Sequence, residues 1–158
     1  MGVDVGQLRT LVVRPALHYI ELWSQAAENL VVGTALTESH GEFLRQLGGG
    51  PALGLWQMEP ATHTDIWDNY LAFKDELADR VRGLQTVRAD DFHEELVGNL
   101  FYAAAMCRVH YRRVKAPLPS SDDANGLASY WKRHYNTPAG AGTVSGALPY
   151  FVQACEGE

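Results

Sequence analysis

Apolar residues recur three and four positions apart along most of this chain, and no other feature limits its fold as strongly. The spacing is clearest between residues 7 and 23, where apolar side chains stand at Leu8, Leu11, Val12, Ala16, Tyr19, Ile20 and Trp23. The alternating runs typical of β-strands are weak by comparison. Because helices with one apolar face must bury that face against each other, the sequence predicts an all-α fold.

Helix start and stop signals divide this pattern into separate segments. We predict helices at residues 7–23, 25–39, 60–71, 74–84, 90–114 and 144–154, and one that begins after Ser120 or Ser121 and runs through Trp131. Ser24 is suited to cap the second helix, and Pro60 to the first turn of the third. Pro15 is expected to kink the first helix, and Pro149 to kink the last one or delay its start.

Two glycine-rich stretches, residues 48–54 and 137–142, are predicted to be loops because glycine accepts backbone angles that other residues resist. The chain has 158 residues, of which 46% are hydrophobic and 20% charged. That composition supports an ordinary buried core and excludes global disorder. We therefore treat residues 1–158 as a single domain.

Charge and hydropathy exclude two classes of partner. The 13 basic and 19 acidic side chains give a net charge of −6, which makes the chain a poor general binder of nucleic acid. No apolar run reaches the roughly 18 residues that a membrane-spanning helix needs. We expect neither a nucleic-acid partner nor a membrane span.

Cysteine and histidine spacing gives little sign of a metal site or a cofactor. Cys107 and Cys155 form no CxxC motif, and Cys107 lies in an apolar stretch where it is expected to be a buried small hydrophobic residue. A disulfide between them is the less favoured alternative. Glu59 and His63 lie four apart, which suggests two polar residues on one helix face rather than metal ligands. We expect no metal and no cofactor.

Glu38 is the residue whose position most suggests chemistry. Val31 and Ala35 precede it by seven and three positions, so they share its helix face, and it stands near the negative end of the predicted helix 25–39. Apolar neighbours and the helix dipole both disfavour a carboxylate, so both should raise the pKa of Glu38. A carboxyl group that keeps its proton near neutral pH is what general-acid cleavage of a glycosidic bond requires. A solvated surface glutamate is the plainer alternative.

A family resemblance gives this position a specific meaning. The tripeptide TES at residues 37–39, followed by GLWQMEPAT at residues 54–62, resembles the E-S…G-L-M-Q-I-x-P-x-T pattern of soluble lytic transglycosylases. These enzymes belong with goose-type lysozymes to the lysozyme-like superfamily. The resemblance implies a lysozyme-like fold with a central buried helix and glycine-rich cleft loops, its core motifs spanning residues 35–144. The stretch QMEPATH also resembles small proteins of tailed phages.

The resemblance implies a role for each residue of a substrate cleft. Glu38 matches the catalytic glutamate of the family, and Ser39 and Gln57 would position Glu38 and the glycan. Trp56 replaces a methionine and, with Met58, would line the cleft wall, where its flat face suits a sugar ring. The alternative for Trp56 is a side chain buried in the hydrophobic core. The segment YNTPAGAG at residues 135–142 resembles the family's A-Y-N-A-G-P-G, which assigns Tyr135 and Asn136 to glycan binding. The alternative there is a helix end followed by a turn.

The implied activity is cleavage of peptidoglycan at the β-1,4 bond between N-acetylmuramic acid and N-acetylglucosamine. Enzymes that hydrolyse such bonds normally use two carboxyl groups, and Glu59, Asp65 and Asp68 are the candidates for a second one. Capping of the third helix is the simpler interpretation of Asp65. Lytic transglycosylases need one glutamate alone, so we favour that route over hydrolysis.

The expected partner is a peptidoglycan glycan strand, with other virion proteins as further partners if the chain is carried by a phage. The N-terminus lacks a basic segment followed by an apolar one, so no signal peptide is visible. We therefore expect synthesis in the cytoplasm and action at the bacterial cell wall, in a phage virion or after release. The alternative function is a catalytically inactive lysozyme-like scaffold that binds glycan or protein.

Overall fold

Helices account for the regular structure of the computed structural model, which describes residues 2–86, 91–137 and 139–157. In these ranges strand-like pairing is limited to isolated bridges, Arg45 with Leu53 and Leu53 with Met58. The prediction of an all-α chain is therefore confirmed for the described residues. None of the helices in these ranges combines the length and apolar character needed to cross a membrane.

The N-terminal segment contains three consecutive helical pieces rather than one kinked helix. These are α1 (Val5–Gln7), the π-helix η1 (Leu8–Val13) and α2 (Arg14–Tyr19). In η1 the N–H of Arg14 bonds the carbonyl of Arg9, five residues back. The wider turn lies directly before Pro15, whose missing N–H removes an ordinary helical hydrogen bond. The predicted disturbance at Pro15 is thus present as a π-turn, and the helix ends at Tyr19 rather than Trp23.

Helix α3 (Gln25–Ser39) has the bounds that the sequence predicts. The hydroxyl of Ser24 accepts a hydrogen bond from the N–H of Ala27, 3.1 Å away, and so caps its first turn. The helix ends where His40 adopts a left-handed conformation, with φ of 55°. Residues 27–36 are all buried, so α3 makes a large contribution to the core.

The middle of the chain agrees with the sequence in its first half and differs in its second. Helices α4 (Pro60–Asn69) and α5 (Asp75–Gly83), joined by η2 (Leu71–Phe73), lie close to the predicted ranges. The single helix predicted at residues 90–114 is wrong: the chain forms η3 (Phe92–Glu94), α6 (Glu95–Gly98) and α7 (Leu100–Arg112) instead. The break falls at Asn99, whose side chain accepts from the N–H of Tyr102 and starts a new helix. Asp90 lies outside the described residues.

The C-terminal part contains α8 (Ala124–Trp131), η4 (Lys132–Asn136) and α9 (Val144–Glu156). Asp123 caps α8, in place of the predicted Ser120 or Ser121, because its carboxylate accepts from the N–H of Gly126. Helix α9 begins at Val144 as predicted and includes Pro149 within its length. The glycine-rich stretches at 48–54 and 139–142 lie outside the helices.

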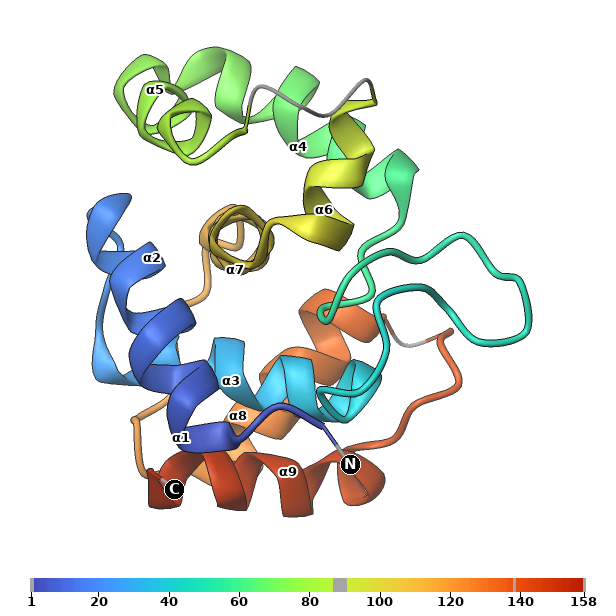
Figure 1. Ribbon diagram of the computed structural model, residues 1–158. Helices are drawn as coiled ribbons and strands as arrows, with labels where there is room; N and C mark the ends of the chain where they lie inside the picture. The colour runs from blue at the N-terminus through green and yellow to red at the C-terminus, as the bar shows by residue number, and fades with distance from the viewer. Residues whose placement is uncertain (1, 87–90, 138, 158) are drawn as a thin grey trace.

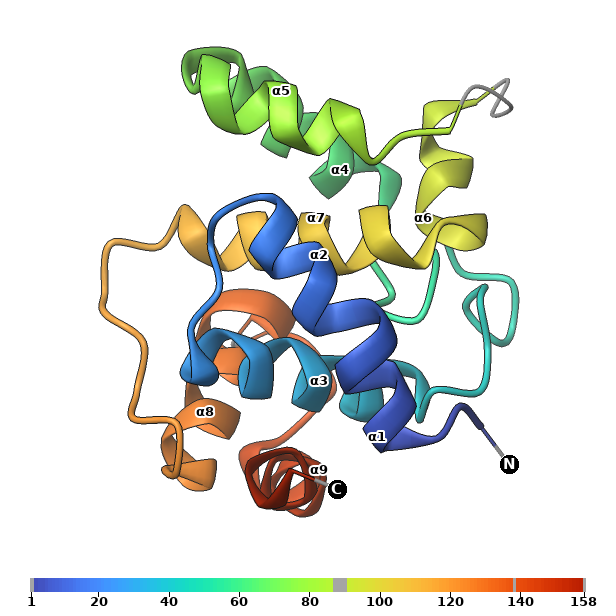
Figure 2. The same ribbon diagram turned by 60° about the vertical axis from the view of Figure 1, so that its left-hand side comes forward.

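The helices pack above and below α7 (Figures 1 and 2). Helices α4 and α5 lie on one side of it, over a core that includes Ile66, Leu96 and Met106. Helix α3 lies on the other side with α8 and α9, over a second core. Helix α9 approaches α3 so closely that a Cβ at Gly33 would stand 2.4 Å from the ring of Phe151. This arrangement brings the C-terminal end of α3 next to residues more than 90 positions later in the chain.

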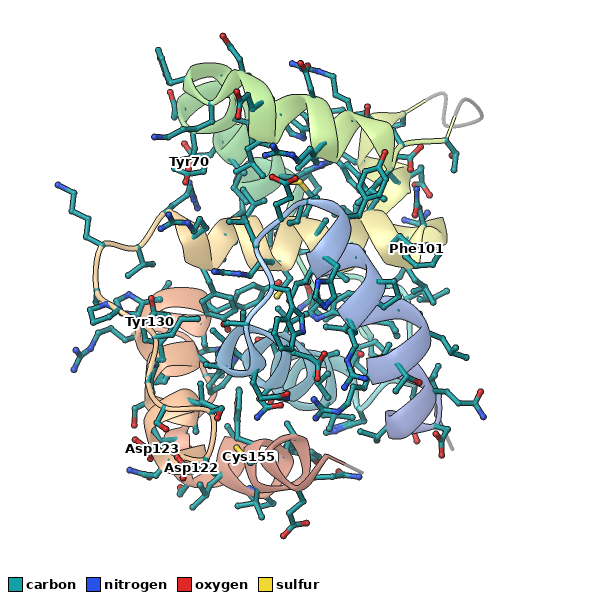
Figure 3. The ribbon with its side chains drawn as sticks, turned by 90° about the vertical axis from the view of Figure 1, so that its left-hand side faces the viewer. Tyr70, Phe101, Asp122, Asp123, Tyr130 and Cys155 are labelled. Carbon is teal, nitrogen blue, oxygen red and sulfur yellow. The ribbon has the colours of Figure 1, made fainter. Side chains whose placement is uncertain are left out.

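Both cysteines are free thiols, so the structure contains no Cys107–Cys155 disulfide. Cys107 is fully buried on α7, and burial raises the pKa of its thiol. Its predicted role as a small core residue is confirmed. Cys155 lies at the edge of the molecule on α9, beside the loop that carries Asp122 and Asp123 (Figure 3).

Candidate active site

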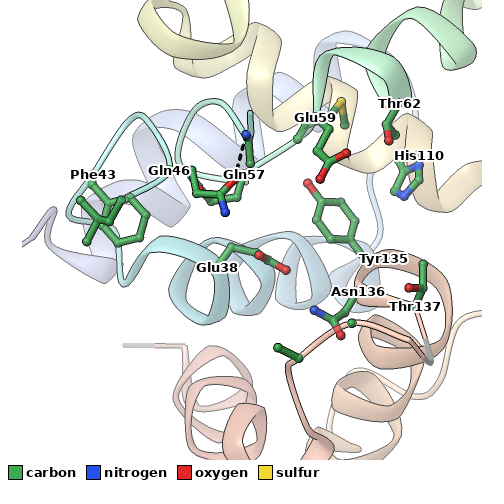
Figure 4. A pocket seen from close by; sticks show the side chains of 15 residues that line it. Glu38, Phe43, Gln46, Gln57, Glu59, Thr62, His110, Tyr135, Asn136 and Thr137 are labelled. Carbon is green, nitrogen blue, oxygen red and sulfur yellow. Dashed lines mark hydrogen bonds between the residues drawn. The ribbon is translucent and has the colours of Figure 1, made fainter. Parts of the chain in front are cut away.

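A cavity of about 630 Å³ opens beside the C-terminal end of α3 (Figure 4). Glu38 comes from α3, Gln57 and Met58 from the loop before α4, and Tyr135 and Asn136 from η4. Five of the seven site residues expected from the sequence therefore border the same space. The other two, Ser39 and Trp56, are buried beside it.

Glu38 is partly buried and carries a shifted pKa. Its Oε1 accepts a hydrogen bond from the indole N–H of Trp131, 2.9 Å away. Burial raises the pKa of Glu38 to about 7, although the hydrogen bond from Trp131 acts in the opposite direction by stabilising the charged form. The predicted direction of the shift is confirmed, and burial is its cause. At neutral pH, Glu38 is therefore protonated in a large share of the molecules.

The wall opposite Glu38 is a tight loop at residues 53–58. Leu53 and Met58 exchange backbone hydrogen bonds of 2.9 and 3.0 Å, and Gln57 Nε2 donates to the carbonyl of Gly54 at 2.8 Å. Gly54 has φ of 77°, and a Cβ there would lie 2.0 Å from the carbonyl oxygen of Leu96. Only glycine fits this position. Gln57 also has a positive φ, 47°, and its side chain borders the cavity across from Glu38 (Figure 4).

Ser39 holds this wall to the end of α3 from inside the protein. It is fully buried, and its hydroxyl donates to the carbonyl of Leu55 at 2.7 Å and accepts from the N–H of Gly41. The expected position of Ser39 at the glycan is therefore wrong, because the side chain does not reach the cavity. Its part in placing the wall relative to Glu38 is supported by these bonds.

Trp56 is a core residue. Its side chain is 1% exposed, and its indole N–H donates to the carbonyl of Val31 at 2.9 Å. Of the two expectations for Trp56, the structure shows the core side chain and not the sugar platform. Leu55 and Met58 of the tight loop are buried as well, and Gln57 is the residue of this loop that is partly exposed.

Tyr135 and Asn136, both in η4, form a second wall of the first cavity. The hydroxyl of Tyr135 donates to the carbonyl of Trp56 at 2.5 Å, and its ring stacks on Tyr111 with centroids 5.3 Å apart. The Oδ1 of Asn136 accepts from the ammonium of Lys132 at 2.8 Å. Tyr135 thereby ties η4 to the loop that carries Gln57, and the two walls of the cavity are fixed to each other.

One of the three candidate second carboxylates lies at the cavity. Glu59 is exposed and borders it, whereas Asp65 and Asp68 do not. Asp65 accepts from Asn69 and pairs with Arg113, each at 2.7 Å. The interpretation of Asp65 as a helix cap is wrong, because its side chain bonds forward along α4 and across to Arg113, the residue that follows α7.

A second cavity of about 460 Å³ adjoins the first. Glu38 and Asn136 border both cavities, and Trp131, His40 and Tyr150 line the second. The rings of His40 and Tyr150 lie 5.2 Å apart. Glu38 therefore forms part of the border of both cavities.

Two residues of this site carry no signal in the local sequence. Trp131 is 93 residues from Glu38, and His110 is a single histidine between Arg108 and Arg112 in α7. His110 borders the first cavity near Thr62. Neither belongs to a motif, so only the packing of α7 and α8 around α3 identifies them.

His63 points away from the cavity into a buried polar cluster. Its Nδ1 lies 2.9 Å from Nδ1 of His93, and its Nε2 lies 2.6 Å from the hydroxyl of Tyr102. Trp67 donates to the same hydroxyl at 2.9 Å. Within the described ranges, no group of three or more His, Cys, Asp or Glu side chains is arranged to hold a metal ion. The cluster joins α4 and η3 to α7.

No protein-family model, no curated protein and no solved structure matches this chain. The family resemblance is therefore a hypothesis carried by the motifs quoted above. The geometry around Glu38 is independent of that resemblance.

Proposed function

We propose that this protein is a lysozyme-like enzyme that cleaves the peptidoglycan glycan strand in the manner of a lytic transglycosylase. The proposal rests on the observation that Glu38, with a pKa of about 7, borders a cavity together with Gln57, Tyr135 and Asn136. A partly buried carboxyl group that retains its proton can donate it to the bridging oxygen of a bound glycan.

The proposed reaction uses the carboxyl group of Glu38 twice. First, the Glu38 proton passes to the oxygen that joins C1 of N-acetylmuramic acid to the next sugar, and the C1–O bond breaks. The Glu38 carboxylate then takes the proton of the C6 hydroxyl of the same muramoyl unit, while O6 bonds to C1. The product is a 1,6-anhydro sugar, no water is consumed, and Glu38 regains its proton.

One observation favours hydrolysis as the second candidate reaction. Glu59 borders the same cavity as Glu38, so a second carboxyl group is available to activate water. The transglycosylase route does not need this group. Glu59→Gln therefore separates the two reactions, because it should leave transglycosylation nearly unchanged and should lower hydrolysis by two orders of magnitude or more.

Digestion of purified cell walls tests the proposal. Native protein should lower the turbidity of a wall suspension, and Glu38→Gln should reduce the rate by roughly a thousandfold or more. Glu156→Gln is the matched control, because Glu156 is an exposed carboxylate at the end of α9, outside the cavity. Equal rates for native protein and Glu38→Gln would remove Glu38 from the reaction.

Mass spectrometry of the products identifies the reaction class. Transglycosylation yields anhydro-muramoyl ends, and hydrolysis yields reducing ends that are 18 mass units heavier. Glycan binding without cleavage by the native protein would contradict the enzyme and support the inactive scaffold. We further propose that the enzyme acts as part of a phage virion, on the resemblance of residues 57–63 to phage proteins; its absence from purified virions of a phage that encodes it would contradict this.

A further inference from the structure

A chain of polar contacts that the proposed reaction does not use ends on His110, at the border of the first cavity. Asp65 accepts from Asn69 and from Nη1 of Arg113, each at 2.7 Å. The other terminal nitrogen of Arg113, Nη2, lies 2.7 Å from Nδ1 of His110. Asp65 thus holds the guanidinium of Arg113 against one nitrogen of the His110 ring.

This contact fixes the position of the hydrogen on the His110 imidazole. A guanidinium group only donates hydrogen bonds, so Nδ1 must accept and the ring hydrogen must be on Nε2. Burial, and next the positive charge of Arg113, lower the pKa of His110 to about 4, against the opposing effect of Asp65. At neutral pH His110 is therefore an uncharged ring whose Nε2–H can only donate.

The ring is also held in orientation by its packing. It meets the ring of Tyr135 edge to face, with centroids 4.9 Å apart and planes at 80°. Figure 4 shows His110 beside Thr62, at the end of the cavity opposite Phe43. Among the described residues Nε2 has no hydrogen-bond partner, so the donor is available to a molecule in the cavity.

We propose that His110 is a specificity-determining residue whose Nε2–H donates a hydrogen bond to an uncharged oxygen of the sugar bound at that end of the cavity. The acceptor is a hydroxyl or an amide carbonyl. Arg113 and Asp65 are positioning residues, because they act through the tautomer of His110. This inference rests on the proposed function, since the sugar is its ligand.

Binding of a tetramer of N-acetylglucosamine, measured by calorimetry on the Glu38→Gln protein, tests the inference without cleavage. Adding His110→Phe should weaken binding by roughly five- to tenfold. Adding His110→Gln, whose amide N–H reaches a similar position, should restore the affinity to within about twofold. His18→Phe, on exposed α2 surface away from the cavity, should change nothing. Tetramer affinity unaffected by His110→Phe, or no tetramer binding at all, would overturn the inference.

Two further readouts separate this role from a purely structural one. Nitrogen NMR at pH 7 should show the Nε2–H tautomer for His110, and the Nε2–H signal should move when the tetramer is added. The Nδ1–H tautomer would contradict the inference. In the otherwise native protein, which keeps Glu38, His110→Phe should raise the KM for cell walls several-fold and leave kcat nearly unchanged.

The experiments can reject the proposed reaction and the proposed His110 contact independently of each other. Walls left intact by the native protein, together with tetramer binding weakened by His110→Phe, would reject the reaction and keep the His110 contact. Walls cleaved equally well, with equal KM, by native protein and His110→Phe would reject the His110 contact and keep the reaction.

Discussion

The indole N–H of Trp131 donates to Oε1 of Glu38 across 2.9 Å, and this contact leaves Oε2 as the oxygen better placed to carry the proton. Trp131 has a donor and no acceptor, so Oε1 must accept in both protonation states. Because the carbonyl oxygen of a carboxyl group is a stronger acceptor than its hydroxyl oxygen, this contact favours the acidic hydrogen on Oε2. In the proposed reaction Oε2 is the atom that protonates the glycosidic oxygen, and α8 fixes its identity.

Removing this donor should raise the pKa of Glu38 further. Trp131→Phe takes away a hydrogen bond that favours the charged form, so the alkaline limb of the pH–rate profile should move up by about one pH unit. Trp23→Phe is the matched control, because Trp23 donates in the same way to Glu28 at 3.0 Å outside the cavity. Identical alkaline limbs for native protein and Trp131→Phe would contradict this role.

Glu38 should cost the protein stability when it is ionised. Its pKa of about 7 in the folded state lies above the ordinary value of 4.5, so the folded state loses stability relative to the unfolded state as pH rises from 4.5 through 7. Glu38→Gln removes this loss and should be more stable than native protein at pH 8 by about 1–3 kcal/mol. Denaturant unfolding at pH 8 and pH 4.5 measures the difference, which should nearly vanish at the lower pH. A native protein as stable as Glu38→Gln at pH 8 would show that the carboxylate is not destabilised.

The buried His63 cluster should make the fold sensitive to acid. Burial, and then the neighbouring His93, lower the pKa of His63 from 6.5 to about 4. Because the unfolded chain protonates His63 more readily than the folded protein does, the free energy of unfolding is unaffected by this residue above pH 6.5. It falls by up to about 3 kcal/mol as pH falls from 6.5 towards 4. The free energy of unfolding should therefore fall less steeply over this window in His63→Gln, with His110 responsible for part of the remaining slope. Parallel curves for the two proteins would contradict the assignment.

Gly54 should tolerate no side chain. Its positive φ and the Leu96 carbonyl 2.0 Å from an added Cβ together predict that Gly54→Ala costs about 2–5 kcal/mol and displaces the wall that carries Gln57. Gly48→Ala is the control, because Gly48 also has a positive φ, 83°, but nothing lies within 4 Å of its Cβ. That variant should cost only about 1 kcal/mol. Equal losses in thermal unfolding would mean that the close approach to Leu96 is unimportant.

The sequence predicts those parts of the fold whose signals are local. Helix α3 follows from Ser24, and α4 from Pro60, because a cap and a first-turn proline act on the next few residues. The break at Asn99 was missed because an asparagine that caps a helix is a single polar residue beside a long apolar run. The choice of Asp123 over the two serines depends on how the chain after Pro119 turns, which no local pattern records.

In the site, too, local sequence predicts some features, whereas others depend on how distant segments pack. Burial raises the pKa of Glu38 in the direction that its apolar helix neighbours predict. The roles of Trp56 and Ser39 depend on the tight turn at Gly54, which sends one side chain inward and presents Gln57 outward. Tertiary packing alone brings Trp131 to Glu38 and the second cavity, and His110 to the first cavity, so sequence spacing could not have identified them.

Carbon NMR of the Glu38 carboxyl group is the most direct test of the central claim, that Glu38 keeps its proton near neutral pH at the edge of the cavity. The signal is assigned in protein with ¹³C-labelled glutamate by its loss in Glu38→Gln, and its shift is followed from pH 3 to pH 9. We predict a titration midpoint near pH 7. A midpoint near the ordinary value of 4.5 would mean that Glu38 is ionised at neutral pH, and it would contradict Glu38 as the general acid.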